Sequence, residues 1–255
     1  MKKFLFLSFV SLAVLFSGCE KVDTPNTDDN DTPFATWLQG SWVLADEVYI
    51  VNVIFNESEW FQTDGRNSSE GTYTLDGDVL TMRSGDSLAD LIKVIMPCDN
   101  VLVMRFLNDM GDDWGLADEF ELFFRENSEV NLPASDIQGK WFWHPNGDTS
   151  IVRMSLEITD STFDFIIPLW RERMKGTFEY SNGRINFHVK EFLTRENPEG
   201  RTESLENLYQ GWSAPTEESS RTEPSFGYDF RRSFVPVEGV AYAMLYGGPT
   251  YLVKQ

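Results

Sequence analysis

The sequence predicts an all-β protein of two tandem eight-stranded antiparallel barrels, for three reasons. Aromatic residues, which favour strands, are frequent: 20 Phe, 8 Trp and 8 Tyr among 255 residues. Short apolar runs alternate with Gly, Asn, Asp or Pro through most of the chain, as strands alternate with turns. The phrase Gln-Gly-x-Trp occurs twice, at residues 39–42 and 138–141, each time at the start of such a run. Two β-sandwiches are the alternative that these observations leave open.

The N-terminal segment has the pattern of a targeting signal. Two lysines precede an apolar run, residues 4–16, that is too short to span a membrane, and two small residues then precede Cys19. This segment resembles a bacterial lipoprotein signal, although Phe16 stands where that family usually has Leu. The resemblance implies that residues 1–18 are a signal peptide and that Cys19 carries the lipid. An ordinary secretory signal is the alternative.

Residues 19–33 are predicted to form a flexible acidic tether, because they are polar, contain prolines and show no periodicity. An acidic stretch after the lipidated cysteine is similar to the surface-export signals of Bacteroidetes lipoproteins. It implies an outer-membrane lipoprotein at the cell surface or facing the periplasm. The whole chain has 41 acidic and 21 basic residues, a net charge of −20 that would repel a phosphate backbone. We therefore expect no nucleic-acid partner.

The first predicted domain, residues 34–130, contains eight strand-like runs of apolar and β-branched residues. Asp76-Gly77 lies between two half-apolar runs and indicates a hairpin turn. Residues 131–136 then interrupt the pattern and are interpreted as an interdomain linker. The eight runs are 41–50, 51–56, 59–63, 71–77, 78–84, 91–96, 101–107 and 120–126.

The second predicted domain, residues 135–255, repeats the first. Gly40 and Gly139 lie 99 residues apart, and the Gly-Thr-aromatic starts at Gly71 and Gly176 lie 105 apart. Markers in the same order at nearly constant spacing indicate an internal duplication. Apolar side chains alternate with polar ones along 152–158, as expected for a sheet with one dry face. The eight runs are 140–144, 149–158, 161–167, 173–180, 183–191, 229–235, 239–246 and 249–254.

Eight antiparallel strands with one dry face can remove their edges by closing into a barrel. The starts Gly40-Ser41-Trp42 and Gly139-Lys140-Trp141 resemble the lipocalin-like, or calycin, families. The order of later elements is similar to the tandem lipocalin-like domains of Bacteroidetes lipoproteins. The resemblance implies that Gly40 and Gly139 let the backbone turn tightly, and that Trp42 and Trp141 close each barrel from below. The Thr-Asp-Tyr segment and C-terminal helix of true lipocalins are not visible, which favours looser relatives.

Residues with catalytic or metal-binding potential are sparse. His144 and His188 have no metal-ligand spacing, and no nucleophile elbow or phosphate-binding loop is present, so we expect no metal, no cofactor and no catalysis. Residues 108–119 gather five acidic side chains around Trp114, which suits either a solvated loop or a sugar or cation site. If Cys19 carries lipid, Cys98 has no intrachain partner and is expected to be a buried, inert thiol.

The long connection 192–228 has no counterpart in the first half, so a diverged function is expected there. A short helix is predicted around 203–209. The predicted ligand-binding residues are Tyr209, Trp212 and Trp170 at the mouth of the second barrel, together with Trp114. A merely structural loop is the alternative.

The leading functional hypothesis is a lipid-anchored cell-envelope binding protein without catalysis, which binds a small apolar ligand or a glycan. The alternative is a structural or interaction module of an envelope protein complex, with solid barrels. A glycan hydrolase is third, because acidic residues are abundant and a close pair in a cleft could serve as its acids.

Overall fold

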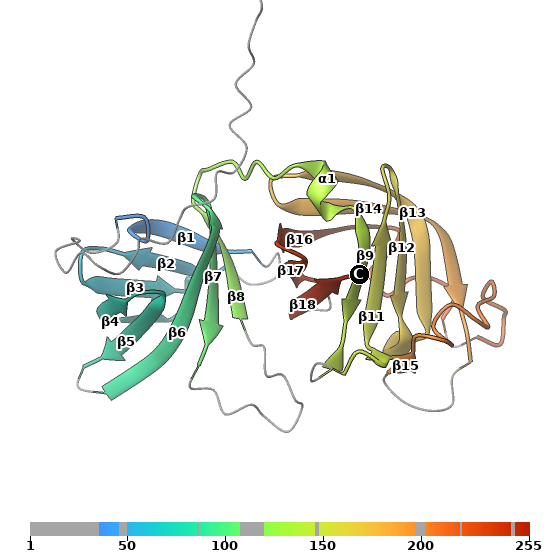
Figure 1. Ribbon diagram of the computed structural model, residues 1–255, viewed down its shortest axis with the longest axis horizontal. Helices are drawn as coiled ribbons and strands as arrows, with labels where there is room; N and C mark the ends of the chain where they lie inside the picture. The colour runs from blue at the N-terminus through green and yellow to red at the C-terminus, as the bar shows by residue number, and fades with distance from the viewer. Residues whose placement is uncertain are drawn as a thin grey trace, which may run out of the picture.

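The computed structural model describes residues 36–45, 50–85, 87–107, 120–145, 148–196, 202–219, 221–245 and 248–255, with the side chains of 87–89 left aside. It confirms the predicted fold class, because the strands form two closed eight-stranded antiparallel barrels (Figure 1). The signal peptide, the tether with Cys19, and the acidic loop with Trp114 lie outside the described residues.

The first barrel is an up-and-down meander in which each strand pairs with the next and β1 pairs with β8 to close the sheet. All eight predicted runs correspond to strands. These are β1 (Gly40–Leu44), β2 (Asn52–Phe55), β3 (Glu59–Thr63), β4 (Ser68–Asp76), β5 (Val79–Ser84), β6 (Ser87–Cys98), β7 (Val101–Phe106) and β8 (Phe120–Arg125).

The second barrel closes through the pairing of its last strand with its first. Its strands are β9 (Gly139–Trp143), β11 (Met154–Ile158), β12 (Thr162–Ile167), β13 (Glu172–Ser181), β14 (Arg184–Thr194), β16 (Asp229–Val237), β17 (Val240–Met244) and β18 (Pro249–Lys254). A separate two-stranded sheet, β10 (Ile151–Val152) and β15 (Glu203–Ser204), lies outside the closed barrel. The helix predicted around 203–209 is wrong: a short strand is followed there by turns. One turn of helix, α1 (Ala134–Ile137), follows the start of the predicted linker.

Apolar side chains of the barrels' own strands fill both interiors. The alternation of strand residues points one set inward, so that large side chains with almost no exposure meet along each axis. In the first barrel the largest buried side chains are Trp42, Phe55, Leu80, Ile92 and Phe123. In the second they include Trp141, Phe165, Phe187, Phe234 and Met174.

Trp42 closes one end of the first barrel. Its indole Nε1 donates a hydrogen bond of 2.8 Å to the carbonyl of Leu38, and the Arg125 guanidinium lies 4.3 Å from its ring centroid. Gly40 has a φ of +121°, and a Cβ there would lie 2.7 Å from Nη1 of Arg125. The backbone conformation therefore favours glycine at this position of the repeated phrase, and a larger residue would also have to displace the Arg125 guanidinium.

The second barrel repeats this closure. Trp141 Nε1 donates to the carbonyl of Ile137 at 2.7 Å, and Nζ of Lys254 lies 5.1 Å from the Trp141 ring centroid. Gly139 has a φ of +129°, and a Cβ there would lie 2.7 Å from Cε of Lys254. The shared phrase thus produces a shared structure, in which a tryptophan is held between a backbone carbonyl and a cation of the last strand.

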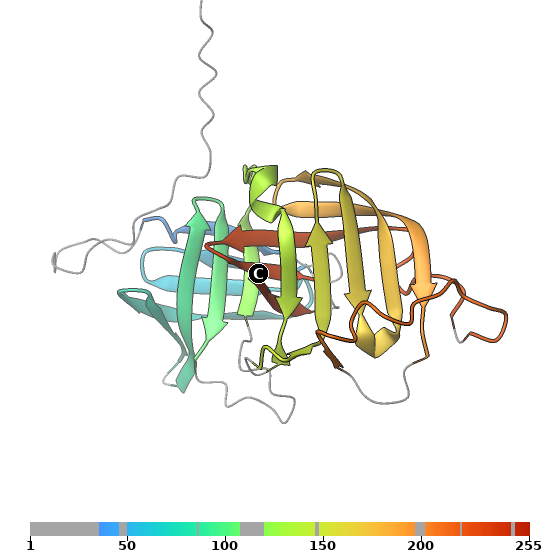
Figure 2. The same ribbon diagram turned by 45° about the vertical axis from the view of Figure 1, so that its right-hand side comes forward.

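The two barrels pack against each other through the outer faces of β6, β7 and β8 and of β16, β17 and β18 (Figures 1 and 2). Phe120 meets Tyr242 edge to face with centroids 5.1 Å apart. The Ser233 hydroxyl donates a buried hydrogen bond of 2.7 Å to the carbonyl of Ala45. The interface is apolar, so the two barrels form one packed unit and are not independent domains joined only by a linker.

Cys98 belongs to this interface cluster and is buried, with 1% of its surface exposed. It is disulfide-bonded, so the expectation of a free thiol is wrong.

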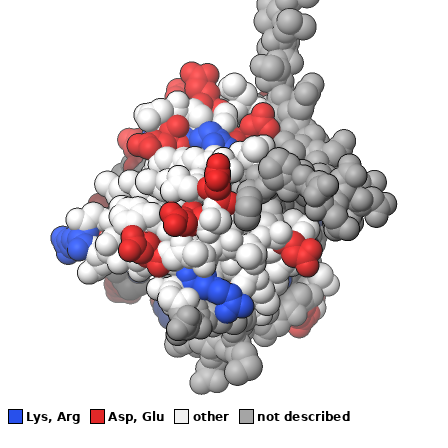
Figure 3. All heavy atoms as spheres, turned by 90° about the vertical axis from the view of Figure 1, so that its left-hand side faces the viewer, with Lys and Arg blue, Asp and Glu red and all other residues white. Residues whose placement is uncertain are grey.

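The surface of the first barrel carries its charge in dispersed form. On the face shown in Figure 3, acidic side chains are interspersed with a few basic ones across a largely uncharged surface. The overall acidity is therefore not gathered into one patch on this face.

Candidate functional site

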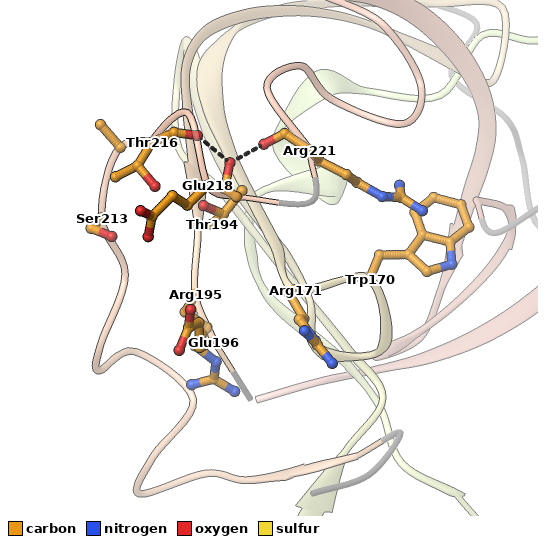
Figure 4. Close-up of a pocket in the computed structure, with 11 residues that line it drawn as sticks. Trp170, Arg171, Thr194, Arg195, Glu196, Ser213, Thr216, Glu218 and Arg221 are labelled. Atoms are coloured by element: carbon orange, nitrogen blue, oxygen red, sulfur yellow. Dashed lines mark hydrogen bonds between the residues drawn. The ribbon is translucent and has the colours of Figure 1, made fainter. Parts of the chain in front are cut away.

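A cleft of about 500 Å³ lies at the loop end of the second barrel, opposite the end closed by Trp141 (Figure 4). One wall is the turn between β12 and β13, and the other is the long connection after β14. The lining side chains are polar or charged apart from one tryptophan and one alanine: Trp170, Arg171, Thr194, Arg195, Glu196, Ser213, Ala214, Thr216, Glu218, Ser219 and Arg221.

The barrel wall of the cleft is set by a tight turn, the 3-10 helix η2 (Pro168–Trp170). Proline at its first position presets the helical φ. Arg171 ends the turn in the left-handed conformation, with a φ of 60°, and its N–H donates to the carbonyl of Pro168 at 3.0 Å. A non-glycine residue is uncommon there. The turn brings Trp170 and Arg171 to the cleft from neighbouring positions.

The loop wall is tied to the end of β14. Thr194 and Ser213 exchange both backbone hydrogen bonds, at 2.8 and 3.0 Å. Further along, the Ser219 hydroxyl donates to the carbonyls of Thr216 and Arg221, at 2.9 and 2.7 Å (Figure 4). These bonds give the loop a defined shape where it lines the cleft.

Arg195 joins the cleft to the rest of the long connection. Its side chain is only 7% exposed, forms an ion pair with Glu203, and lies over the Trp212 ring with the guanidinium carbon 4.6 Å from the centroid. Its Nη1 donates to the carbonyls of Asn207 and Gln210. Among the described residues, its buried Nε has no hydrogen-bond acceptor. Most contacts of the Arg195 guanidinium are therefore with the long connection and fix its position.

Glu172 holds the final part of the connection, residues 221–228, across the loop end of the barrel. Its carboxylate is fully buried and accepts hydrogen bonds from Nη1 of Arg221 at 2.5 Å and from the N–H and hydroxyl of Ser225. Phe226 packs between Trp170 and Phe230, with centroid distances of 4.9 and 5.1 Å. We call residues 221–228 the cap.

The cleft suits a ligand with both an apolar face and many hydroxyl groups. An indole offers an apolar surface, while serine, threonine, arginine and carboxylate groups offer donors and acceptors around it. Three arginines and two glutamates line it, and Arg195 and Arg221 are already paired with Glu203 and Glu172. The charges are therefore nearly balanced, which does not favour a strongly ionic ligand.

Of the four predicted ligand-binding residues, Trp170 borders the cleft. Tyr209 and Trp212 lie instead on the outer wall of the barrel, where residues 205–212 cover Phe142, Val152 and Ile166. The Tyr209 hydroxyl is 3.3 Å from that of Ser155. The structure thus does not bring Tyr209 and Trp212 into the cleft beside Trp170, and Trp114 lies outside the described residues.

Sequence reasoning missed Arg171, Arg221 and Glu172. Arg221 and Glu172 are 49 residues apart, and neither stands in a recognisable motif. The one local signal was Pro-Leu-Trp-Arg after an apolar strand, since proline there indicates a turn that could aim the next side chains.

The two histidines occupy separate structural roles. His144 Nδ1 lies 2.8 Å from the carbonyl of Ile151, and His188 Nδ1 lies 2.7 Å from Asp229. Within the described ranges, no group of three His, Cys, Asp or Glu side chains is arranged to hold a metal ion.

A second groove lies on the outer face of β11 to β14. It is lined mainly by charged side chains, and two of these, Lys175 and Glu191, form an ion pair at 3.7 Å. It is more open than the first cleft and no tryptophan lines it. We therefore take the first cleft as the candidate site.

Fold and site define a protein of two tandem closed antiparallel barrels, consistent with a calycin-like fold, with one polar cleft at the loop end of the second. No family model, no curated protein and no solved structure matches the chain. In the described part of the chain, no helix has the length and apolar character needed to cross a membrane.

Proposed function

We propose that the protein is a lipid-anchored, non-catalytic binding protein of the cell envelope that holds a neutral glycan in the cleft at Trp170. The observation that carries this proposal is the composition of that cleft: one tryptophan, surrounded by hydroxyl groups and by planar charged groups in near balance. Pyranose rings combine an apolar face with a rim of hydroxyls, which matches these groups.

The filled barrels support a ligand outside the barrels over a small apolar ligand inside. Interior positions such as Phe165, Phe187 and Trp141 have less than 2% of their surface exposed. A carrier barrel needs empty, apolar space around its axis, and close-packed aromatic side chains occupy that axis here.

The membrane anchor is proposed from the resemblance of residues 1–19 to the lipoprotein signals of Bacteroidetes. A lipid thioether and a disulfide exclude each other at one sulfur atom. Cys98 is disulfide-bonded, so lipidation of Cys19 requires that this disulfide is formed with a cysteine other than Cys19 of the same chain. Intact-mass and peptide mass spectrometry of the membrane fraction test this directly. We expect a lipid-modified Cys19 and release of the protein from membranes in Cys19→Ala; a Cys19–Cys98 disulfide in the mature protein would contradict the anchor.

Glycan binding is tested by titration calorimetry of the chain without residues 1–18, carrying Cys19→Ser, against maltohexaose, cellohexaose, xylohexaose and mannohexaose. We expect one of them to bind, and Trp170→Ala to weaken binding at least tenfold, about 1.4 kcal/mol, because the apolar platform is lost. Tyr209→Phe is the control, since Tyr209 lies on the outer wall. An unchanged affinity in Trp170→Ala would contradict the proposed site.

The packed interiors and the apolar contact between the barrels also favour the second candidate, an interaction module of an envelope complex. Binding of none of the four sugars, together with co-purification of a defined protein partner from crosslinked envelopes, would favour that candidate. Release of shorter oligosaccharides on prolonged incubation would instead favour the hydrolase.

A further inference from the structure

A buried carboxylate, that of Glu172, binds the cap to the barrel. Glu172 stands at the start of β13 and points to the interior side, like Met174 two residues on. Among the described residues, the hydrogen bonds to its carboxylate come from Arg221 and Ser225, which both belong to the cap. A buried charge that loses its partners is strongly unfavourable, so Glu172 favours the closed position of the cap.

Aromatic packing supports the same position. Phe226 packs on Trp170 and Phe230, and the guanidinium carbon of Arg232 lies 4.5 Å from the Phe226 ring centroid. On the far side of the cap, the N–H of Val189 donates to the carbonyl of Tyr228 at 2.7 Å. Cap residue Phe226 therefore completes the apolar cluster at the loop end of the barrel.

Two residues belong to both the cap contacts and the cleft. Arg221 lines the cleft, bonds Glu172, and lies over the Trp170 ring with its guanidinium carbon 5.7 Å from the centroid. Trp170 lines the cleft and receives Phe226 on its ring. Opening of the cap would therefore remove Arg221 from the cleft wall and free one side of the Trp170 ring.

We propose that cap closure and ligand binding are coupled, with Glu172 as the latch, so that a sugar in the cleft stabilises the closed cap. This inference rests on the proposed function, because it names the regulation of that same cleft. Linkage requires the effect to be reciprocal: the factor by which bound sugar favours the closed cap is the factor by which cap closure strengthens sugar binding.

A variant at Ser225 tests the latch without changing the cleft wall, because the Ser225 hydroxyl donates a hydrogen bond to Glu172 and Ser225 does not line the cleft. The test variants are Ser225→Ala and Glu172→Gln. The matched control is Ser128→Ala in the first barrel, because the Ser128 hydroxyl also donates a hydrogen bond, to the carbonyl of Arg125 at 2.6 Å. Amide hydrogen exchange of residues 221–228 is measured with and without the hexasaccharide that binds most tightly in the calorimetric panel.

We expect exchange in the cap to be about fivefold faster in Ser225→Ala and faster still in Glu172→Gln, with Ser128→Ala like wild type. We also expect saturating sugar to slow cap exchange in the wild type. Ser225→Ala should bind the sugar more weakly than the wild type, by at most the factor by which its cap exchange is faster. Thermal melting confirms that each variant is folded.

Unchanged cap exchange in folded Glu172→Gln and Ser225→Ala would overturn the latch. Sugar binding to the wild type without slower cap exchange would overturn the coupling while the proposed function stands. Failure of all four sugars to bind would overturn the proposed function and the coupling with it, whatever the exchange of the free variants shows.

Discussion

The two barrels share their closed end and differ at their loop end. At the closed end, Trp42 and Trp141 make the same hydrogen bond to the carbonyl four residues earlier. At the loop end, each barrel points an acidic side chain inward, but among the described residues only Glu172 of the second barrel has cationic and hydroxyl partners, supplied by the long connection. The comparison indicates that both copies of the repeated phrase keep the same tryptophan arrangement at the closed end. The long connection after β14 makes the loop end of the second barrel different from that of the first.

The corresponding acid of the first barrel is Glu121 on β8. It shares the inward face with Phe123 and lies opposite Met104, and both are core residues. Burial and the charge of Asp90 raise the pKa of Glu121 to about 7. In the described part of the chain, no donor or cation pairs with it. The two barrels thus differ in whether a buried carboxylate is paired.

The largest effect is expected from the closing tryptophans. Trp42→Ala and Trp141→Ala should each lower the free energy of unfolding by about 3–5 kcal/mol, because each leaves a large cavity and removes a buried hydrogen bond. Urea unfolding followed by circular dichroism measures this loss. A small effect in one barrel alone would show that the shared phrase does not have a shared structural role.

The next effect concerns the interface, which makes one unit of the two barrels. Phe120→Ala should cost about 3 kcal/mol and remove the edge-to-face contact with Tyr242. We expect scanning calorimetry to show one unfolding transition in the wild type and two in this variant, since the barrels then lose much of their coupling. Leu80→Ala, inside the first barrel, is the control that should lower stability without dividing the transition.

The buried acids should respond in opposite directions to neutralisation. Because its pKa is raised, Glu121 holds its proton in the folded state between about pH 4.5 and 7 while the unfolded chain has lost it. The contribution of Glu121 to the free energy of unfolding is therefore fully present below about pH 4.5 and is lost as the pH rises through 7.

At pH 8 we expect Glu121→Gln to stabilise the protein by on the order of 2 kcal/mol, and Glu172→Gln to destabilise it by about 1–3 kcal/mol. Urea midpoints at pH 5 and pH 8 measure both. Loss of stability in Glu121→Gln at pH 8 would mean that the carboxylate has a partner after all.

The smallest effect is expected from the cations over the tryptophans. Arg125 donates to the carbonyls of Gln39, Trp37 and Asp99, whereas Lys254 makes one contact of 3.5 Å to the carbonyl of Asp136. Arg125→Met should cost about 1–2 kcal/mol and Lys254→Met less than about 1 kcal/mol. Equal costs would show that the hydrogen bonds of Arg125 add nothing beyond the stacking.

Prediction from sequence succeeded where short-range rules operate. The alternation along 152–158 and the Asp76-Gly77 turn depend on neighbouring residues, so strand positions and the duplication were visible. It failed where an amphipathic segment had several surfaces available. Residues 205–212 have apolar side chains that could form a helix face or cover a wall, and they cover the wall because they bury the outward-facing Phe142 and Ile166 of the barrel.

The site was predictable only in part, because its geometry comes from contacts across many residues. Trp170 could be singled out as an aromatic residue after a strand. The pairing of Glu172 with Arg221 could not be predicted, because the two residues are 49 positions apart and meet only once the barrel has closed.

By itself, the sequence determined the class of fold, the number of strands in each closed barrel and the place where each barrel begins. These follow from side-chain periodicity and from a backbone position that favours glycine. Tertiary structure alone decided the barrel–barrel interface, the cleft at Trp170 and the cap over Glu172. These depend on which outward-facing side chains meet. An outward face of a closed barrel can pack against more than one other surface, and the local sequence does not select among them.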